Sequence, residues 1–446
     1  MGVMNTTRAW KTCLISLASA AIIVAGAVAE EATKNDDFAR QVNRLVRQLD
    51  DDSAARRDAA ESELFKLAGT TADSVDRFLA VLPAGNDQMP LAVRERLTRI
   101  RTGIEDRAAK AALGGTTVTL DAKSMPVWEA LKAIEKQTGN RVVDHRQRSL
   151  DDANQATVTV AFDDEPYWAA VDELLDQANL GIYAYAGEDA LAVVPRDRGA
   201  VPRHDAAAYQ GPFRIAAMEI QTQRNLQRAD RNSLKLQLEV AWEPRLRPIA
   251  VTQSAADLTA VDETGNQLQP SDADAVLGAE IPNGTQATEL VLPFELPPRS
   301  VSKIASLRGK LRALVPGRQV KFEFADIAKA AGQTQRRGGV EVAVDAVRVN
   351  NEIWEIHMRL RLDEANHALE SHRGWAFQNL SYLVDDQGEP IDNAGLETTM
   401  QSRNEVGVAY FFDHEEGLDG LTWVYETPAA IVELPIEYEL KDLELP

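Results

Sequence analysis

The chain contains a duplicated segment, and this repeat constrains its fold more than any other feature. Residues 117–134 and 157–174 match at corresponding positions, which hold Thr117, Val118, Thr119, Pro126, Trp128 and Ala130 in the first copy and Thr157, Val158, Thr159, Pro166, Trp168 and Ala170 in the second. In each copy, alternating apolar residues predict a strand, and a proline then begins a helix with one apolar face. Because a unit of about 40 residues cannot cover its own helix face, the two copies are expected to share one core as a duplicated βαβ domain at 114–197.

This domain resembles a known periplasmic module. VTLDAKSMPVWEALKAIEKQTGNRVV, then VTVAFDDEPYWAAVDELLDQANLGIY and a closing LAVVP, resemble the short N-terminal domain shared by secretins and TonB-dependent receptors. The resemblance implies a docking module and not an enzyme, although the chain departs from that family after residue 197. The order of a helical segment, this domain and a long β-rich remainder is similar to that of secreted proteins of the planctomycete type.

The resemblance to a docking module directs attention to the strand edges of the domain. An extended partner segment can add to an open edge through backbone hydrogen bonds. The predicted partner-binding edge consists of Arg141, Val142 and Val143, or of the strand that begins with Ile182 and Tyr183.

The N-terminus predicts export. Arg8 and Lys11 precede an apolar run that ends in Ala27-Val28-Ala29, which is the order of a secretory signal, so residues 1–29 are expected to be removed. The one cysteine, Cys13, lies within that signal. The net charge of −21 disfavours nucleic acid as a partner, and no later apolar run is long enough to predict a membrane span.

Residues 36–112 are predicted to form a helical domain. Apolar residues recur at helical spacing, as at Val42, Val46 and Leu49, and short polar turns separate the helices. LVRQLDDDSAARRDAAESELFKLAG resembles one HEAT-type repeat, and a plain helical bundle accounts for the pattern equally well.

The remainder of the chain is predicted to be β-structure. Residues 198–212 have the composition of a linker, and apolar residues then alternate with polar ones, as around Leu236 and Met358. Two tandem β-sandwiches are expected, at 213–330 and 338–446, with residues 242–248 leaving the first as an extended edge. The predicted fold class is therefore multidomain α+β, with an N-terminal helical array, the duplicated docking-type domain and two sandwiches.

No stretch carries a catalytic signature. His357, His367 and His372 lack the spacing of metal ligands on one helical face, and no serine lies in a G-x-S-x-G elbow. Three acidic clusters, at 163–165, 262–263 and 385–386, fit a helix start and hairpin turns better than a calcium loop. Trp128 and Trp168 are interpreted as packing residues, with a ligand clamp as the alternative. No catalytic residue, metal or cofactor is therefore predicted.

These features favour a non-catalytic interaction or adaptor protein of the periplasm or cell envelope, with an envelope protein as its partner. The alternative is a hydrolase that acts on an envelope polymer, or a carbohydrate-binding protein, with its site between domains. A convergent set of titratable side chains would distinguish the enzyme from the adaptor.

Overall fold

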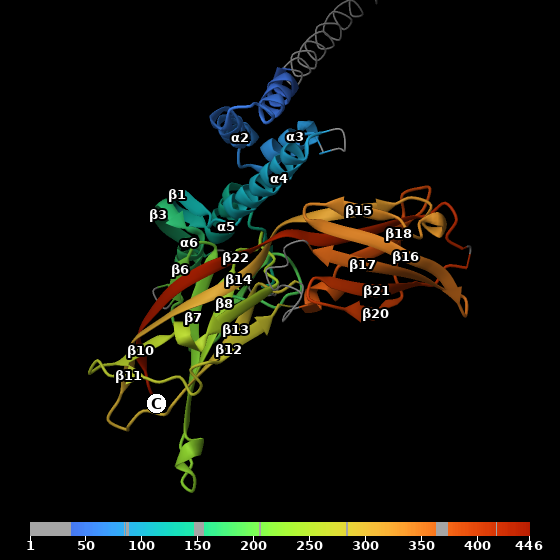
Figure 1. Cartoon of the computed structure of the whole chain (residues 1–446). Coiled ribbons are helices and arrows are strands. Elements are labelled where there is room, and N and C mark those ends of the chain that lie inside the picture. Colours follow the sequence, from blue (N-terminus) through green and yellow to red (C-terminus); the bar gives the residue numbers. More distant parts are fainter. Residues whose placement is uncertain are drawn as a thin grey trace, which may run out of the picture. The chain divides into compact units, whose positions relative to one another are not determined.

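The computed structural model describes residues 37–446 except 84, 86–88, 147–155, 205–206, 282–283, 363–372 and 416 (Figure 1). The described chain is mostly β, with several sheets, and its α-helices lie in the N-terminal part. It divides into two compact units, Met1–Ala112 and Leu113–Pro446. The expected signal at 1–29 lies outside the described residues.

The first unit is helical. Residues 37–48 form a helix, followed by α2 (Ala54–Ala68), α3 (Ala72–Val81) and α4 (Leu91–Ala112). The side chain of Thr71 caps α3 by accepting a hydrogen bond from the backbone N–H of Ser74. The apolar positions predicted from helical spacing are buried in one shared core, which includes Val42, Leu49, Leu64, Phe78, Leu97 and Ile100. None of the described helices combines the length and hydropathy of a membrane-spanning helix.

The second unit begins with the duplicated segment. The first copy consists of β1 (Thr117–Pro126), α5 (Val127–Thr138) and β2 (Val142–Asp144), and the second of β3 (Thr157–Pro166), α6 (Tyr167–Gln177) and β4 (Leu180–Ile182), followed by β5 (Leu191–Pro195). β1 pairs antiparallel with β3, and β2, β5 and β4 form a separate sheet in that order. Both helices pack into one core with Val118, Val158 and Leu191. The predicted strand–helix units and their shared core are therefore present.

The two copies are related by reciprocal contacts. Thr119 Oγ1 accepts a hydrogen bond from the backbone N–H of Asp164, and Thr159 Oγ1 accepts one from Ser124, both at 3.1 Å. Ser124 and Asp164 also have positive φ values of 50° and 60° at equivalent positions. The repeat in the sequence is thus a repeat of local geometry.

A four-stranded sheet follows. Its order is β13-β8-β7-β6, formed by β6 (Ala207–Gln210), β7 (Phe213–Gln223), β8 (Ser233–Trp242) and β13 (Ala287–Phe294). The alternation predicted for β8 is present, since Leu234, Leu236, Leu238 and Val240 are buried. Strand β6 lies within the segment predicted to be a linker, and pairs with β7.

An eight-stranded sheet is built on two long strands, β14 (Lys303–Phe324) and β22 (Thr422–Glu444). They pair from Lys303 opposite Glu444 to Phe324 opposite Trp423. The smaller strands of this sheet are β9 (Ala250–Ser254), β10 (Thr259–Asp262), β11 (Gln267–Leu268), β12 (Val276–Glu280), β18 (Leu380–Val384) and β19 (Pro390–Asp392). We call the β14–β22 pair the long ribbon. The pairing crosses the boundary predicted between 213–330 and 338–446.

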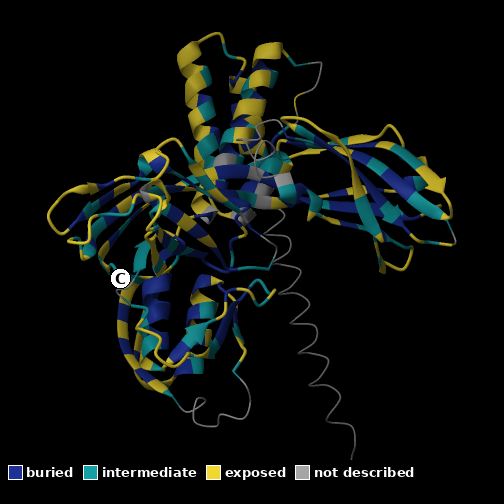
Figure 2. Cartoon of the chain, turned by 90° about the horizontal axis from the view of Figure 1, so that it is seen from below, coloured by how far each residue is buried: buried dark blue, intermediate teal, exposed yellow. Residues whose placement is uncertain are grey.

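A five-stranded sheet covers one end of the long ribbon. Its order is β15-β16-β17-β21-β20, from β15 (Thr334–Arg337), β16 (Val340–Asn350), β17 (Ile353–Leu362), β21 (Glu405–Phe412) and β20 (Gly395–Gln401). Phe324 and Trp423 of the ribbon share a core with Met358 and Tyr410 of this sheet. The ribbon also contacts β6 and β7, so it faces a different sheet along each part of its length. Figure 2 shows buried residues along the strands of the sheets.

Candidate functional site

The predicted partner-binding edge on β2 is already occupied. The backbone N–H of Val142 donates to Glu135 Oε2 at 3.3 Å, and its carbonyl accepts from Lys132 Nζ at 3.0 Å. Lys132 and Glu135, both on α5, form an ion pair at 2.6 Å. Of the predicted residues Arg141, Val142 and Val143, the central one therefore has no open backbone group for an added strand.

The edge at β4 is partly occupied as well. The carbonyl of Leu180 accepts from Arg196 Nε at 3.2 Å, and that of Ala184 accepts from the backbone N–H of Gln286 at 2.8 Å. The N–H of Tyr183 donates within the sheet, to β5. The predicted residue Ile182 thus lies between two carbonyls that already have donors.

Two tyrosine side chains nevertheless protrude from the domain. Tyr183 and Tyr185 are 49 % and 44 % exposed, and their rings meet edge to face with centroids 6.2 Å apart. We call them the tyrosine pair. Partial burial raises the pKa of Tyr185, and the negative charges of Glu289 and Glu239 raise it further. The pair is therefore an exposed aromatic surface with carboxylates near Tyr185.

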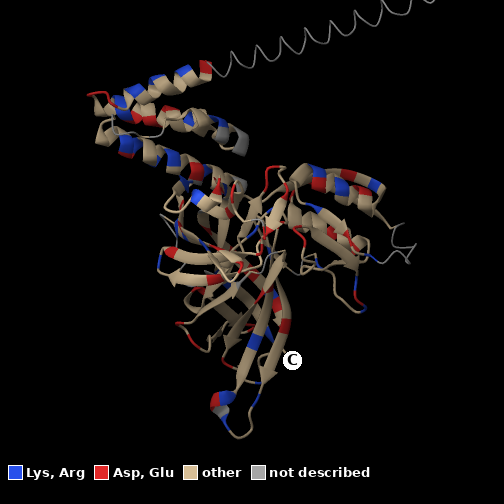
Figure 3. Cartoon of the chain, turned by 90° about the vertical axis from the view of Figure 1, so that its right-hand side faces the viewer, with Lys and Arg blue, Asp and Glu red and all other residues tan. Residues whose placement is uncertain are grey.

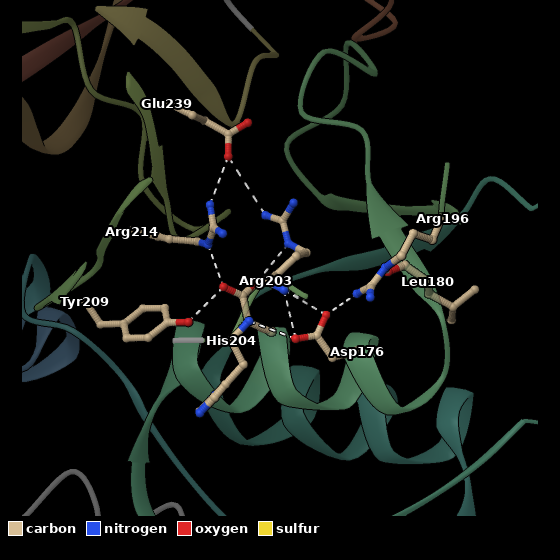
Figure 4. A network of polar contacts seen from close by, with 9 residues as sticks. Asp176, Leu180, Arg196, Arg203, His204, Tyr209, Arg214 and Glu239 are labelled. Carbon is tan, nitrogen blue, oxygen red and sulfur yellow. Dashed lines mark hydrogen bonds and ion pairs between the residues drawn. The ribbon is translucent and has the colours of Figure 1, made fainter. Parts of the chain in front are cut away.

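A buried ion-pair network connects the duplicated segment to the four-stranded sheet (Figure 4). The carboxylate of Asp172, which is fully buried on α6, accepts from Arg203 Nε and the Tyr209 hydroxyl, both at 2.9 Å, and from Arg214 Nε at 2.5 Å. Arg214 also donates to Glu239 on β8 at 3.0 Å. These contacts fix α6 to β6, β7 and β8.

Asp176 extends this network by one helical turn. It accepts hydrogen bonds from the backbone N–H groups of Arg203 and His204, each at 2.8 Å, and from the side chain of Arg196. Burial opposes ionisation, but these donors outweigh it and lower the pKa of Asp176. The segment 198–212, predicted as a linker, is therefore held by hydrogen bonds on both sides of the two residues that are not described.

The protonation states of Tyr209 and Arg214 favour their hydrogen bonds to the carboxylates of this network. Burial raises the pKa of Tyr209, and the negative charge of Asp172 raises it further, so the phenol remains a hydrogen-bond donor. Arg214 is 3 % exposed and pairs with carboxylates on both sides. Asp172, Tyr209 and Arg214 thus have protein partners, and their arrangement indicates a structural tie between the duplicated segment and the four-stranded sheet.

Glu243 forms a second tie. It is fully buried and accepts from the backbone N–H and the hydroxyl of Thr116, from Asn140 Nδ2 and from Arg245 Nε, at 2.7, 2.8, 3.0 and 2.7 Å. Glu243 belongs to residues 242–248, which were predicted to leave the sheet as an extended edge. The sequence did not predict that its side chain is buried. Thr116 and Asn140 lie more than a hundred residues away in the sequence, so local pattern gave no sign of them.

A cavity of about 440 Å³ lies where three parts of the second unit meet. The turn between β4 and β5 contributes Asp189, and the loop after β8 contributes Arg247. The long ribbon contributes Gln319 and Glu426, near the end at which Phe324 pairs with Trp423. The wall of the cavity also includes Trp242, at the end of β8, and Trp375, in the short 3-10 helix η4 (Arg373–Phe377). This is the kind of junction at which small-molecule sites occur.

The duplicated tryptophans do not occupy equivalent environments. Trp168 is 2 % exposed and its indole N–H donates to the carbonyl of Pro212 at 3.0 Å, which supports packing. Trp128 is half-buried, and Lys132 Nζ and the Arg146 guanidinium lie 5.1 and 5.6 Å from its ring.

The remaining sequence candidates are dispersed or outside the described residues. His357 Nε2 lies 2.8 Å from Glu355, whereas His367 and His372 are not among the residues described. Asp262 accepts from the backbone N–H groups of Thr264 and Asn266, both within its own turn. The described part of the chain contains no group of three or more His, Cys, Asp or Glu residues that could hold a metal ion. Charged residues of both signs occur throughout the fold (Figure 3).

Comparison of the chain with protein-family models and with curated proteins finds no match. The candidate sites are therefore chosen from the exposure, contacts and cavities of the described residues. They are the tyrosine pair and the cavity at the junction.

Proposed function

We propose that the chain is a non-catalytic adaptor protein of the cell envelope, exported to the periplasm or cell surface, which binds a partner protein through the tyrosine pair. One observation carries this proposal. Tyr183 and Tyr185 are large aromatic side chains that remain about half exposed on a domain tied to its neighbours by buried ion pairs. The resemblance of residues 114–197 to a docking module supports the same function.

The energetics of interfaces favour such a pair. Tyrosine is enriched among the few residues that carry most of the binding energy of protein interfaces. A surface held in place before binding also loses less conformational freedom when it binds. Asp172 and Glu243 provide that support, because each ties the domain to the sheet below it.

Recognition through side chains replaces the strand addition predicted from the sequence. Glu135 and Lys132 already bond to the backbone of Val142, so a partner strand would have to displace them. Glu289 lies near Tyr185, and the chain carries a net charge of −21. We therefore expect the partner surface to be basic and apolar.

Crosslinking in intact cells tests this proposal. A chain with Tyr183→Ser and Tyr185→Ser should lose the proteins captured by the natural chain. The matched control carries Val201→Ser and Leu226→Ser, which change residues that are 73 % and 92 % exposed elsewhere in the same unit, and should retain them. Equal capture by the tyrosine variant would assign partner binding to another surface. Turnover of an envelope polymer by the purified protein would contradict the non-catalytic function itself.

A further inference from the structure

The cavity at the junction has a chemistry that is independent of the tyrosine pair. Among the described residues that line it, the polar side chains include the amides of Gln319, Gln378 and Asn379 and the hydroxyl of Thr285. Arg247 is the one cation in this lining, and it pairs with Asp189. Asn379 Nδ2 already donates to the hydroxyls of Tyr425 and Thr427, so the wall offers a few neutral hydrogen-bonding groups and little net charge.

This composition restricts the class of ligand. A phosphorylated or otherwise highly anionic molecule needs several unpaired cations, whereas the charge of Arg247 is already balanced. A lipid chain would cover the Gln319 amide and the Arg247–Asp189 pair without forming a hydrogen bond to them. A neutral molecule with several hydroxyl groups satisfies amides and a carboxylate, and its C–H faces can pack against indole rings.

Two buried polar atoms, one on a residue that lines the cavity and one on a residue next to the lining, have no hydrogen-bond partner among the described residues. They are the indole N–H of Trp242, a donor, and Oε1 of Gln286, an acceptor. The two residues are adjacent, since the backbone N–H of Trp242 donates to the carbonyl of Gln286, and Thr285 next to it lines the cavity. Buried polar groups are satisfied in nearly all native proteins, and other orphaned atoms among the described residues, such as the Tyr167 hydroxyl, lie away from this cavity. The Trp242 donor differs because its residue lines the cavity, which favours a polar ligand there.

Two other fully buried tryptophans, unlike Trp242, have hydrogen-bond partners for their indole N–H groups. Trp168 donates to the carbonyl of Pro212 at 3.0 Å, and Trp423 donates to Ser381 Oγ at 2.9 Å. Neither residue lines the cavity. All three side chains are buried, with exposures of 2 % or less.

We propose that this cavity binds a neutral saccharide unit. The ligand packs against Trp242 and Trp375, and with a small shift of the wall a hydroxyl group accepts the hydrogen bond that the Trp242 indole donates. Glu426 and Gln319, from the two strands of the long ribbon, contact further hydroxyl groups. The site combines residues from three parts of the fold, so binding requires the intact second unit.

Titration calorimetry of the full chain with neutral disaccharides, with and without N-acetyl groups, tests the proposal. The natural chain should bind at least one of them, and Trp242→Phe should weaken binding about fivefold to tenfold, the effect of one neutral hydrogen bond. Trp242→Phe should lower the melting temperature less than Trp168→Phe or Trp423→Phe does, because all three variants lose the same buried ring volume but Trp242 has no bonded N–H to lose. Gln319→Leu, at an exposed position, should also weaken binding without affecting the fold.

Trp168→Phe and Trp423→Phe are the matched controls. Each removes an N–H that is bonded within the protein, so each should lower the melting temperature while leaving the saccharide affinity intact. The proposal is overturned if the natural chain binds no neutral disaccharide at millimolar concentration, or if Trp242→Phe and Gln319→Leu both bind as tightly as the natural chain. Binding of sugar phosphates alone would equally overturn the assignment of a neutral ligand.

Discussion

Asp172 on α6 lies 2.5 Å from Arg214 on β7, and the two side chains are 0 % and 3 % exposed. The pair joins the duplicated segment to the four-stranded sheet through charges that are almost completely shielded from water. A buried pair of this kind stabilises little relative to an apolar contact, but loss of one partner leaves the other charge buried alone. The domain is therefore attached by an interaction that is costly to break.

Replacement of Asp172 tests this attachment. We expect Asp172→Asn to lower the free energy of unfolding of the second unit by about 3–5 kcal/mol, because Arg214 and Arg203 lose the charge that they share. Urea denaturation followed by tryptophan fluorescence measures the change. Asp230→Asn, which removes an exposed partner of Arg228, serves as the control and should have little effect. A similar small effect at Asp172 would show that the network does not hold the domain.

The duplicated tryptophans provide a matched pair of substitutions. Trp168→Ala should cost about 3–5 kcal/mol, because it leaves a cavity in the core and removes the bond to Pro212. Trp128→Ala should cost roughly 1–2 kcal/mol, since that ring is half-buried and contacts the cations of Lys132 and Arg146. Thermal and chemical denaturation of both variants gives the comparison. A loss below ~1 kcal/mol at Trp168 would favour a ligand clamp over packing.

Acid should weaken the five-stranded sheet through Glu355. Hydrogen bonds from His357, Arg348 and Asn350 lower the pKa of Glu355 from 4.5 to about 2. A carboxyl group with a lowered pKa stabilises the fold above its ordinary pKa, and this contribution is lost as the pH falls from about 4.5 towards about 2. Across that pH range, the free energy of unfolding should depend on pH less steeply for Glu355→Gln than for the natural chain. Identical pH dependence in the variant and the natural chain would exclude a role for Glu355.

A shortened chain tests the long ribbon. A chain that ends at residue 330 keeps β14 but lacks β22, its partner along the ribbon. We expect it to be sensitive to proteases and to unfold without cooperativity, because the strand loses backbone pairing and apolar cover. Addition of a peptide with residues 422–444 should restore protection. Cooperative unfolding of the shortened chain alone would instead support two independent sandwiches at the predicted boundaries.

Much of the local structure was predictable from the sequence. Spacing placed Val42 and Leu49 on one helical face, alternation placed Leu236 and Leu238 inside a sheet, and both residues of each pair are buried. The duplication predicted two strand–helix units with one core. In each case a residue and its neighbours within a few positions carry the pattern, because helices and strands have fixed periods.

The sites were less predictable, and two signals were available. Asp172 is a charged residue within the apolar stripe of α6, and Arg214 lies in an apolar run at the start of β7. A charge inside an apolar pattern indicates a buried partner, but does not identify it. The tyrosine pair was partly anticipated, since Tyr183 belongs to the predicted edge, whereas the bonds from Lys132 and Glu135 that occupy the other edge depend on how α5 packs.

By itself, the sequence determined the helices of the first unit, the repeated strand–helix geometry of the second and the alternation of its strands, because these follow from periods of two and 3.6 residues. Only the tertiary structure decided that β22 pairs along the whole of β14, that Glu243 bonds to Thr116 and Asn140, and that Trp242 and Glu426 line one cavity. The physical reason is distance along the chain. Hydrogen bonds and buried charges join whichever residues folding brings together, and strand pairing between segments a hundred residues apart leaves no periodic trace in either segment.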